Sequence, residues 1–350
     1  MLSIRTFKSN DIDIVSEFYE RVFDGDVDRK MTAFKWIQAA NLFGESERNY
    51  ILIFVDGKLV GYWGIMPTLL YYCGHRIIGA FSQEALVDPT FRKQGIGTKL
   101  LEEVNRTANL MVSLWHNRAV LAIKKRGGWF NVGQYRPLKK IHRVRSILKL
   151  RNPYVPKILG QILKSRFGAD EFQKRIAPGY DLVFVDKCGN EFDHFFMDVS
   201  PRLGIMSDRT SKTLNWKYID IPHKKYIFIS AKKEMKLCGY AVLRIEEQYN
   251  QIRKGIIVDL LTDINEPEAL VYLIKKSDEI FSQNNVDFSV CIVQPGIFRN
   301  VLKKNGYYEA QSKKTDSLWI YNENNSPDKE VIKNMSNWYF TYGDSDGDMW

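Results

Sequence analysis

Two short sequence patterns recur in the same order at one constant spacing. A Lys-Leu-x-Gly-Tyr segment around Gly61 returns around Gly239, and a glycine-aromatic pair at Gly128 returns at Gly306. Both distances are 178 positions. Two unrelated matches at a single offset are not expected by chance, so the chain contains two copies of one folding unit. A period of domain length with only two copies excludes a solenoid, which stacks at least three short repeats.

Strand and helix patterns alternate along the first copy. A first helix is expected to begin at a cap formed by Ser9 or Asn10 and to end at Phe23, since apolar residues recur there at helical spacing. Asp56-Gly57 is typical of a hairpin turn. The expected strands are residues 4–7, 50–55, 59–66, 77–87 and 111–115, and the further expected helices are residues 97–110 and 119–125. The chain is therefore expected to be an α/β (α+β) protein.

Length and composition fit a protein of two domains with reduced cysteines. The 350 residues suffice for two domains of about 150 residues each. The four cysteines are widely separated and form no CxxC pair, as in cytoplasmic proteins with free thiols. The N-terminus lacks an apolar core followed by a cleavage site, and no apolar run reaches the length of about 18 residues that spans a membrane. We therefore expect a cytoplasmic protein.

The net charge of +10 is concentrated in one block of the chain. No acidic residue occurs between Val104 and Asp170, where there are fifteen basic residues, so the remainder of the chain has a charge of −5. Such a block indicates an anionic partner, which is nucleic acid, a phosphorylated cofactor or substrate, or a membrane surface. No helix-turn-helix or zinc module accompanies it, so a nucleic-acid partner is not expected.

The most specific local pattern runs from Val87 to Leu101, where a strand is followed by a turn, a glycine-rich loop and a helix. Glycines without Cβ atoms and the free amides of a helix N-terminus together make a pyrophosphate site. A Walker loop requires GxxxxGKS/T, which is absent. A dinucleotide fingerprint requires GxGxxG, but its third glycine position is Leu100 here. Both of these classes are therefore excluded.

The loop Arg92-x-x-Gly95-x-Gly97, preceded by a Val-x-Pro strand end, resembles the acetyl-coenzyme A loop of the GNAT N-acetyltransferase superfamily. The order of elements resembles that family over about residues 1–135. In the second copy the corresponding segment, residues 258–267, has no such loop and carries acidic side chains. The resemblance implies two tandem GNAT-like domains, each a mixed, mostly antiparallel twisted sheet flanked by helices, with the second cofactor site degenerate.

The expected domain organisation follows from the repeat and the basic block. It comprises an N-terminal GNAT domain (1–138), a basic connecting region (139–210), a degenerate GNAT-like domain (211–325) and a C-terminal tail (326–350). The tail contains acidic residues from Asp344 to Asp348, which open like a calcium loop but lack its remaining ligands. We expect this stretch to be a solvated tail, with docking through Trp338 and Tyr339 as the alternative, and we expect no metal site.

The resemblance also implies roles for residues of the loop and its neighbours. The backbone amides of Gln94, Gly95, Ile96, Gly97 and Thr98 would hold the pyrophosphate of acetyl-coenzyme A, with charge added by Arg92 and Lys93. The strand-end backbone of Leu86 and Val87 would pair with the pantetheine arm and polarise the thioester carbonyl. Asn117 would contact the pantetheine; the equal alternative is that its side chain caps a helix.

Transfer to an amine requires a group that removes its proton. Glu84, on the strand that leads to the loop, is the first candidate; the alternative is a strand carboxylate paired with a Lys or Arg. His116 is the second candidate, against a purely structural histidine. Relatives often protonate the leaving thiolate with a Tyr, but the matching position here is near Lys124, so the general acid stays unassigned.

The expected function is acetyl-CoA-dependent transfer of an acetyl group to a primary amine. Residues 215–218 resemble tandem GNAT proteins found with polysaccharide genes, which suggests an amino sugar or polysaccharide precursor as acceptor. The aromatic rings of Trp115, Trp129 and Trp216 are interpreted as core rather than as sugar platforms. The alternatives are another acyl or aminoacyl donor, or a non-catalytic protein that binds coenzyme A, a membrane or a partner.

The basic segment at residues 136–166 also contains apolar residues, as at an anionic membrane surface; a solvated interdomain segment is the equal alternative. Because a tandem chain makes within itself the contacts that single-domain relatives make as dimers, we expect a monomer or a weak dimer.

Overall fold

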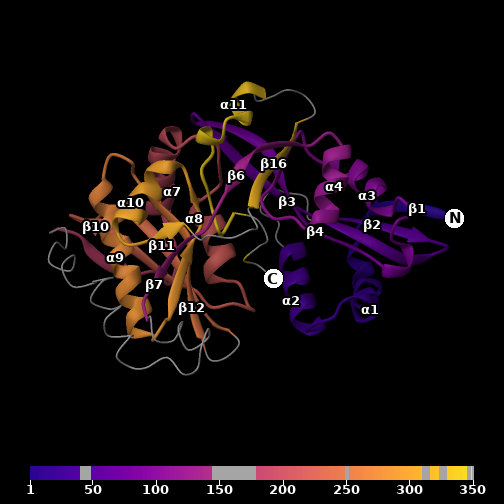
Figure 1. The fold of residues 1–350 in the computed structure, drawn as a ribbon, viewed down its shortest axis with the longest axis horizontal. Coiled ribbons are helices and arrows are strands. Elements are labelled where there is room, and N and C mark those ends of the chain that lie inside the picture. The colour runs from indigo at the N-terminus through magenta and orange to yellow at the C-terminus, as the bar shows by residue number, and fades with distance from the viewer. Residues whose placement is uncertain are drawn as a thin grey trace.

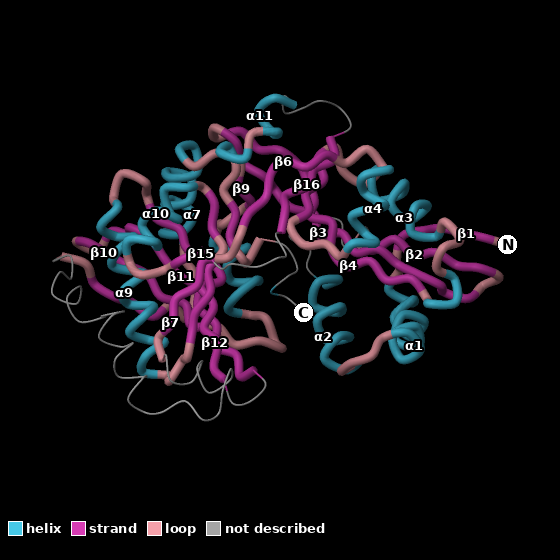
Figure 2. Tube along the Cα trace, viewed as in Figure 1, coloured by secondary structure: helices cyan, strands magenta, loops and turns pink. Residues whose placement is uncertain are grey.

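Two large β-sheets organise the chain into two halves that lie side by side (Figure 1). The computed structural model describes residues 1–39, 49–143, 179–248, 252–309, 316–322, 329–344 and 348. Strands form the centre of each half and helices pack against them (Figure 2). This arrangement agrees with the mixed α/β class and with the two copies expected from the sequence.

The first sheet has the spatial order β1-β2-β3-β4-β5-β16-β6, and β9 pairs with β3 beside this series. Strands β4 and β5 are parallel, and the other pairs are antiparallel. The strands are β1 (Leu2–Thr6), β2 (Tyr50–Val55), β3 (Lys58–Tyr72), β4 (His75–Val87), β5 (Leu110–Ser113), β6 (Phe130–Tyr135), β9 (Met206–Ser207) and β16 (Asp316–Asn322).

The second sheet has the order β15-β7-β13-β12-β11-β10-β8 and again contains one parallel pair, β12 with β13. A short ladder joins β14 (Val293–Gln294) to β17 (Phe340–Thr341). The strands of the second sheet are β7 (Leu138–Ile141), β8 (Asp181–Phe184), β10 (Ile227–Lys233), β11 (Lys236–Gln248), β12 (Ile252–Thr262), β13 (Phe288–Cys291) and β15 (Tyr308–Glu309).

Each sheet contains a long-range strand that the order of the chain would assign to the other sheet. Strand β16 lies between β5 and β6, so that Ile320 pairs with Val112 on one side and Phe130 on the other. In return, β7 lies between β13 and β15 of the second sheet. Figure 1 shows the yellow β16 among purple strands and the purple β7 among orange ones. The two halves are therefore interlocked rather than strung in sequence.

Nine α-helices flank the sheets in the described residues. They are α1 (Ile12–Val22), α2 (Val27–Ala39), α3 (Ile96–Asn105), α4 (Arg118–Arg126), α7 (Asn190–Val199), α8 (Ser211–Leu214), α9 (Pro267–Gln283), α10 (Gly296–Lys304) and α11 (Lys329–Lys333). Successive residues of a strand face opposite sides of its sheet, and the neighbours Tyr62 and Trp63 belong to different apolar clusters. Helices α1 and α2 contribute to the Tyr62 cluster, and α3 contributes to the Trp63 cluster. The first sheet is thus covered on both faces.

The expected strands and helices of the first copy are present, with ends that differ by a few residues, except that β3 continues to Tyr72. Helix α2 is not predicted by the sequence patterns. Its buried side includes Lys30, whose charge interrupts the apolar spacing that marks an amphipathic helix.

The C-terminal acidic stretch is not a solvated tail. Asp344 and Asp348 are each 1% exposed. Asp344 forms an ion pair of 2.5 Å with Arg209, and Asp348 forms one of 2.5 Å with Arg244. The expectation of a solvated acidic tail is therefore wrong for these two side chains, because their basic partners lie far away in the sequence.

Most of the basic segment expected to contact a membrane or to join the domains falls at residues 144–178, outside the described residues. In the part of the chain that the structure describes, no helix is both long and apolar enough to cross a bilayer.

Candidate functional site

Strands β4 and β5, in the middle of the first sheet, separate near the middle of β4 and leave a wedge between them. Their parallel pairing covers only three positions and ends at Phe81 with Val112. Beyond Phe81, β4 pairs with β3 alone. A bulge interrupts that pairing: Ser82 lies opposite Ile65 and Ala85 opposite Trp63, so Gln83 and Glu84 together face one residue. The bulge lies at the point where the strands part, a common place for a functional site.

The loop after β4 is fixed by Asp88. Its carboxylate accepts hydrogen bonds from the backbone N–H and the hydroxyl of Thr90, at 3.0 and 2.6 Å, and forms a 3.2 Å ion pair with Arg21. Burial acts to raise the pKa of Asp88, but the bonds from Thr90 and Arg21 outweigh it and hold the pKa below its ordinary value. Arg21 of α1 also donates to the carbonyl of Leu59 at 2.6 Å. Sequence reasoning missed Arg21, since it lies 67 residues from Asp88.

The loop delivers the N-terminus of α3 to the edge of the wedge. Gly95 caps the helix with φ +79°, a left-handed conformation that favours glycine, and a Cβ added there would meet no atom within 4 Å. Glycine is required at position 97 for a different reason, because a Cβ there would lie 2.8 Å from the side chain of Ile123 on α4. The side chains of Arg92, Lys93 and Gln94 are exposed, as are the surroundings of Gly95. Free helix amides, open space and positive charge therefore coincide, which is the geometry of an anion site.

The remaining residues expected at the donor site border this loop. Leu86 and Val87 end β4 beyond the last pair with β5, and the carbonyl of Val87 accepts a 3.1 Å bond from Arg92. Ile96 is buried beneath the helix N-terminus, with Thr98 half-buried beside it.

Asn117 caps helix α4. Its side chain accepts a 2.9 Å hydrogen bond from the backbone N–H of Val120. This is the arrangement that the helix-cap alternative requires. Asn117 thereby fixes the start of the helix that follows β5 across the wedge.

Glu84 lies in a cluster of donors from three elements. Its Oε2 atom is 2.9 Å from the ammonium of Lys30 on α2 and 3.4 Å from the hydroxyl of Tyr19 on α1, and it also accepts a hydrogen bond from Tyr62 on β3. The hydroxyls of Tyr19 and Tyr62 are 2.7 Å apart. Burial, followed by the charge of Glu84, raises the pKa of Tyr19 well above its ordinary value, so the phenol stays a donor. The ion pair with Lys30 is the contact that the alternative interpretation of Glu84 requires, although sequence reasoning named none of the three donors.

Gln83, the other residue of the bulge, was also missed. Its side chain is 6% exposed, and neither atom of its amide has a hydrogen-bond partner among the described residues. A buried polar group without a partner costs about 1–3 kcal/mol. Such a group next to Glu84 marks a place where a bound molecule can supply the missing bonds.

His116 is held by other elements than Glu84. Its Nδ1 is 3.0 Å from the hydroxyl of Ser113, and its Nε2 donates to the carbonyl of Ser317 on β16 at 2.9 Å. Lys124 of α4 donates to the same Ser113 hydroxyl at 2.5 Å, so that hydroxyl donates onward to Nδ1. Burial, followed by the charge of Lys124, lowers the pKa of His116 to about 4. The imidazole is therefore neutral at pH 7 with both nitrogens engaged.

The low pKa of His116 predicts a loss of stability in acid. In the unfolded chain the imidazole takes up a proton near its ordinary pKa of 6.5, whereas the folded protein resists protonation down to about 4. Its stabilising effect is complete above pH 6.5 and declines as the pH falls toward 4, by about 2 kcal/mol at pH 5. Urea unfolding at pH 7 and pH 5 measures this decline, which should be smaller by that amount in His116→Gln. The exposed His194, replaced by Gln, should leave it unchanged; equal declines in all three proteins would contradict the assignment.

The second sheet has the same separation of parallel strands, but the chain itself fills it. Pairing of β12 with β13 ends at Ile257 with Cys291. At the next residue, the carbonyl of Val258 accepts a 2.7 Å hydrogen bond from the backbone N–H of Gly343. Where the first half has its glycine loop, α9 begins after Glu266, which accepts a 3.0 Å bond from Tyr180. An anion has no place at this second position.

Comparisons with known proteins agree with this geometry. Residues 46–127 match the family model described as an acetyltransferase (GNAT) domain, a span that includes the wedge, the loop, Glu84 and His116. No curated protein matches the sequence of the chain.

Solved structures share the architecture of more than nine tenths of the chain at low sequence identity. A GCN5-related N-acetyltransferase of Anabaena variabilis superimposes with a TM-score of 0.62 and 15% identity, covering 92% of this chain and 73% of its own. N-myristoyltransferase of Saccharomyces cerevisiae with bound myristoyl-CoA superimposes with a TM-score of 0.58 and 12% identity, covering 92% of this chain and 82% of its own. A GCN5-related N-acetyltransferase of Kribbella flavida has a TM-score of 0.57 and 13% identity, covering 91% of this chain and 70% of its own. At these identities the likeness concerns the fold.

Proposed function

Starting from an acyltransferase of the GNAT fold, with residues 46–127 as its acetyltransferase domain, we propose that this chain transfers an acetyl group from acetyl-coenzyme A directly to a primary amine. The observation that carries the proposal is the wedge between β4 and β5, which has an anion-binding helix N-terminus at its edge and Glu84 on its wall. No other part of the described chain combines these features.

The donor binds along the wedge. The amides of residues 94–98 contact its pyrophosphate, and the exposed Arg92 and Lys93 add attraction. The unpaired edge of β4 at Leu86 and Val87 offers backbone groups to the pantetheine arm. The thioester thereby lies where the two strands part, close to the bulge that carries Gln83 and Glu84.

Glu84 is the group that we assign as general base. The acceptor arrives as an ammonium ion, loses a proton to the carboxylate, and attacks the thioester carbonyl as a neutral amine. The carbon–sulfur bond then breaks, and the coenzyme thiolate takes up the second proton, which the nitrogen releases as it becomes the amide. The donors Lys30, Tyr62 and Tyr19 all contact Oε2, which fixes the carboxylate and leaves Oε1 to receive the proton. His116 is less suited, since both of its nitrogens are engaged.

The acceptor enters between the two halves. The rings of Trp36 on α2 and Trp216, just after α8, are nearly parallel at 8° with centroids 6.5 Å apart, and neither indole N–H has a partner among the described residues. Both rings pack against the apolar cluster of the first half, in agreement with their interpretation as core. We propose an amino sugar or polysaccharide precursor as the acceptor, with the two indole N–H groups and the amide of Gln83 available to its polar groups.

A second candidate keeps the reaction and changes the donor. The yeast N-myristoyltransferase of similar fold has myristoyl-CoA bound, so an acyl chain longer than acetyl is the rival. The rival shares the same loop and the same base, and it differs only in the space beyond the thioester.

Calorimetric titration with acetyl-CoA, together with release of free coenzyme A thiol in the presence of glucosamine, tests the proposal. We expect the wild-type protein to bind acetyl-CoA and to release thiol only when an amine is added. Gly95→Glu, which places a carboxylate at the pyrophosphate, should weaken binding at least tenfold, or about 1.4 kcal/mol. Absence of acetyl-CoA binding to the wild-type protein would refute the proposed function.

Gly57→Glu is the matched control. Gly57 lies in the β2–β3 turn with φ +78°, nearly the value at Gly95, and a Cβ there also meets nothing within 4 Å. The two substitutions therefore impose the same backbone strain and the same charge. Only the variant at Gly95 should lose acetyl-CoA.

A further inference from the structure

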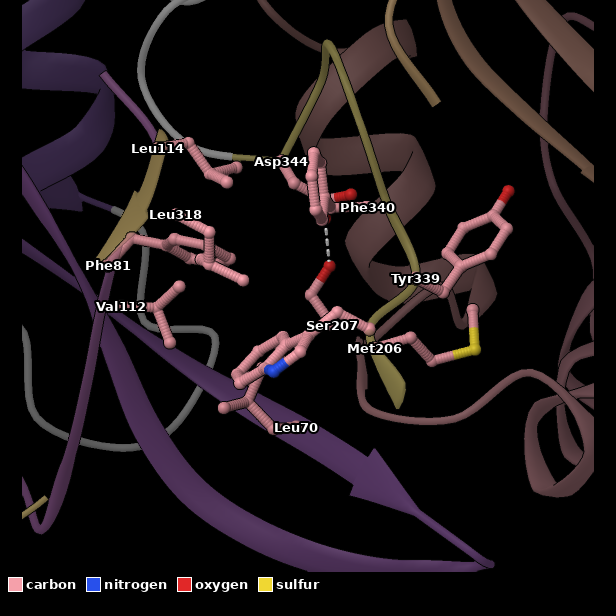
Figure 3. A pocket seen from close by; sticks show the side chains of 11 residues that line it. Leu70, Phe81, Val112, Leu114, Met206, Ser207, Leu318, Tyr339, Phe340 and Asp344 are labelled. Carbon is pink, nitrogen blue, oxygen red and sulfur yellow. Dashed lines mark hydrogen bonds between the residues drawn. The ribbon is translucent and has the colours of Figure 1, made fainter. Parts of the chain in front are cut away.

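A small cavity lies against the first sheet, on the face that contacts the C-terminal segment (Figure 3). Its volume is about 10 Å³, which is about the room needed for one water molecule. Its walls are mostly apolar, and the main contributors are Phe81, Val112, Leu114, Leu318, Trp338 and Phe340. Ser207 and Asp344 close one side, and the hydroxyl of Ser207 donates a hydrogen bond to the carboxylate of Asp344 (Figure 3).

The cavity begins where the wedge begins. Phe81 and Val112 are the last residues that pair β4 with β5, and Leu114 follows the end of β5. All three belong to the apolar cluster on the face that α1 and α2 cover, opposite α3. A molecule that is bound at the loop on the α3 side and extends through the wedge therefore places its opposite end in this cavity.

The opposite wall comes from the end of the chain and is firmly held. Trp338 donates from its indole nitrogen to the carbonyl of Ile332 at 2.8 Å, and the backbone N–H of Tyr339 donates to Ile205 at 2.8 Å. Phe340 is 3% exposed and packs edge-on against Tyr135 with centroids 5.0 Å apart. The backbone of Thr341 donates to Asp344 at 2.7 Å, and Asp344 is paired with Arg209.

We propose that this cavity receives the acyl end of the bound thioester and that Phe340, in the C-terminal segment, limits the donor to chains of about acetyl size. The inference rests on the proposed function, in which the thioester lies where β4 and β5 part. It makes the C-terminal segment the part of the molecule that selects the donor.

The length of the acyl chain decides whether it fits, because the residues around the cavity are closely packed. A methyl group fits a space for one water-sized group, whereas each further methylene requires Phe340 or its neighbours to move. Overpacking a core costs more than the burial of one methylene gains. A chain of eight carbons is therefore expected to bind more weakly than acetyl unless part of the C-terminal wall is removed.

Calorimetric titration of the full-length protein with acetyl-CoA and octanoyl-CoA tests the inference, and its readout is the ratio of the two Kd values. We expect wild type to bind octanoyl-CoA at least tenfold more weakly than acetyl-CoA, a difference of about 1.4 kcal/mol. Phe340→Ala should bring the ratio close to one by tightening octanoyl-CoA binding. Leu114→Ala, which opens the cavity from the other wall, should act in the same direction and serves if Phe340→Ala does not fold.

Phe192→Ala is the control, because Phe192 is 1% exposed in the core of the second half and does not line the cavity. It should keep the wild-type ratio. A wild-type protein that binds both thioesters equally, or folded Phe340→Ala and Leu114→Ala proteins with the wild-type ratio, would overturn the inference while the proposed function stands. Failure to bind coenzyme A and both thioesters would instead refute the proposed function and the inference with it.

Discussion

Replacing Glu84 by Gln is expected to lower kcat by about 10²–10⁴-fold, the usual contribution of a general base, with little change in the Kd for acetyl-CoA. Glutamine keeps the size of the side chain and still accepts hydrogen bonds from Lys30 and Tyr62, but it cannot take a proton from the acceptor amine. The measurement is thiol release at saturating acetyl-CoA, combined with calorimetry for the donor and a thermal melt for folding.

The alternative role for Glu84 is an ion-pair partner of Lys30 and no more. In that case Glu84→Gln would lower the melting temperature and leave kcat of the folded protein unchanged, and that outcome would exclude Glu84 from the chemistry. Glu20→Gln on the exposed side of α1 is the control, since it makes the same change away from the wedge. It should match wild type in both kcat and melting temperature.

Replacing Arg209 by Met is expected to destabilise the protein by about 3–5 kcal/mol, the cost of leaving a buried charge without its partner. Arg209 is 3% exposed and lies 3.2 Å from Asp259 of β12 and 2.5 Å from Asp344. Burial acts to lower the pKa of Arg209, but the two carboxylates raise it well above its ordinary value. Without the guanidinium, both carboxylates remain buried. Urea unfolding followed by circular dichroism measures the loss.

A double-mutant cycle separates this ion pair from a general effect on the core. Adding Asp344→Asn to Arg209→Met should cost less than the sum of the two single changes, because the residues are in contact. Lys333→Met, which removes an exposed ion pair with Glu330, should change stability by less than about 1 kcal/mol. Additive effects in the cycle would show that Arg209 and Asp344 do not stabilise each other.

The elements that sequence patterns predict well are those specified by neighbouring residues. The hairpin at Asp56-Gly57, the strand that ends at Val87 and the loop through Gly95 all depend on local turn chemistry and spacing, and the structure contains them. Glu84 was also selected as a candidate from its place on that strand. Its partner Lys30 was not, since a buried lysine within α2 becomes recognisable only when the carboxylate opposite it is known.

The features that were missed depend on pairing between distant residues. Asp344 is 135 positions from Arg209, so the acidic stretch at the C-terminus has no local sign of burial. The position of β16 between β5 and β6 likewise cannot be predicted from the side chains of β16 alone. Their alternation is compatible with any sheet that has one covered face. The bulge at Gln83 and Glu84 arises from the register between β3 and β4.

The exchange of β16 and β7 sets the order in which the protein can be completed during synthesis. Residues 1–135 leave the ribosome before residues 316–322, which alone fill the gap between β5 and β6. Until then both strands present open edges, which are templates for aggregation. A chain released after residue 135 but before residue 316 therefore contains the whole glycine loop and yet lacks a finished first sheet to carry it, so such a product is open to aggregation and proteolysis.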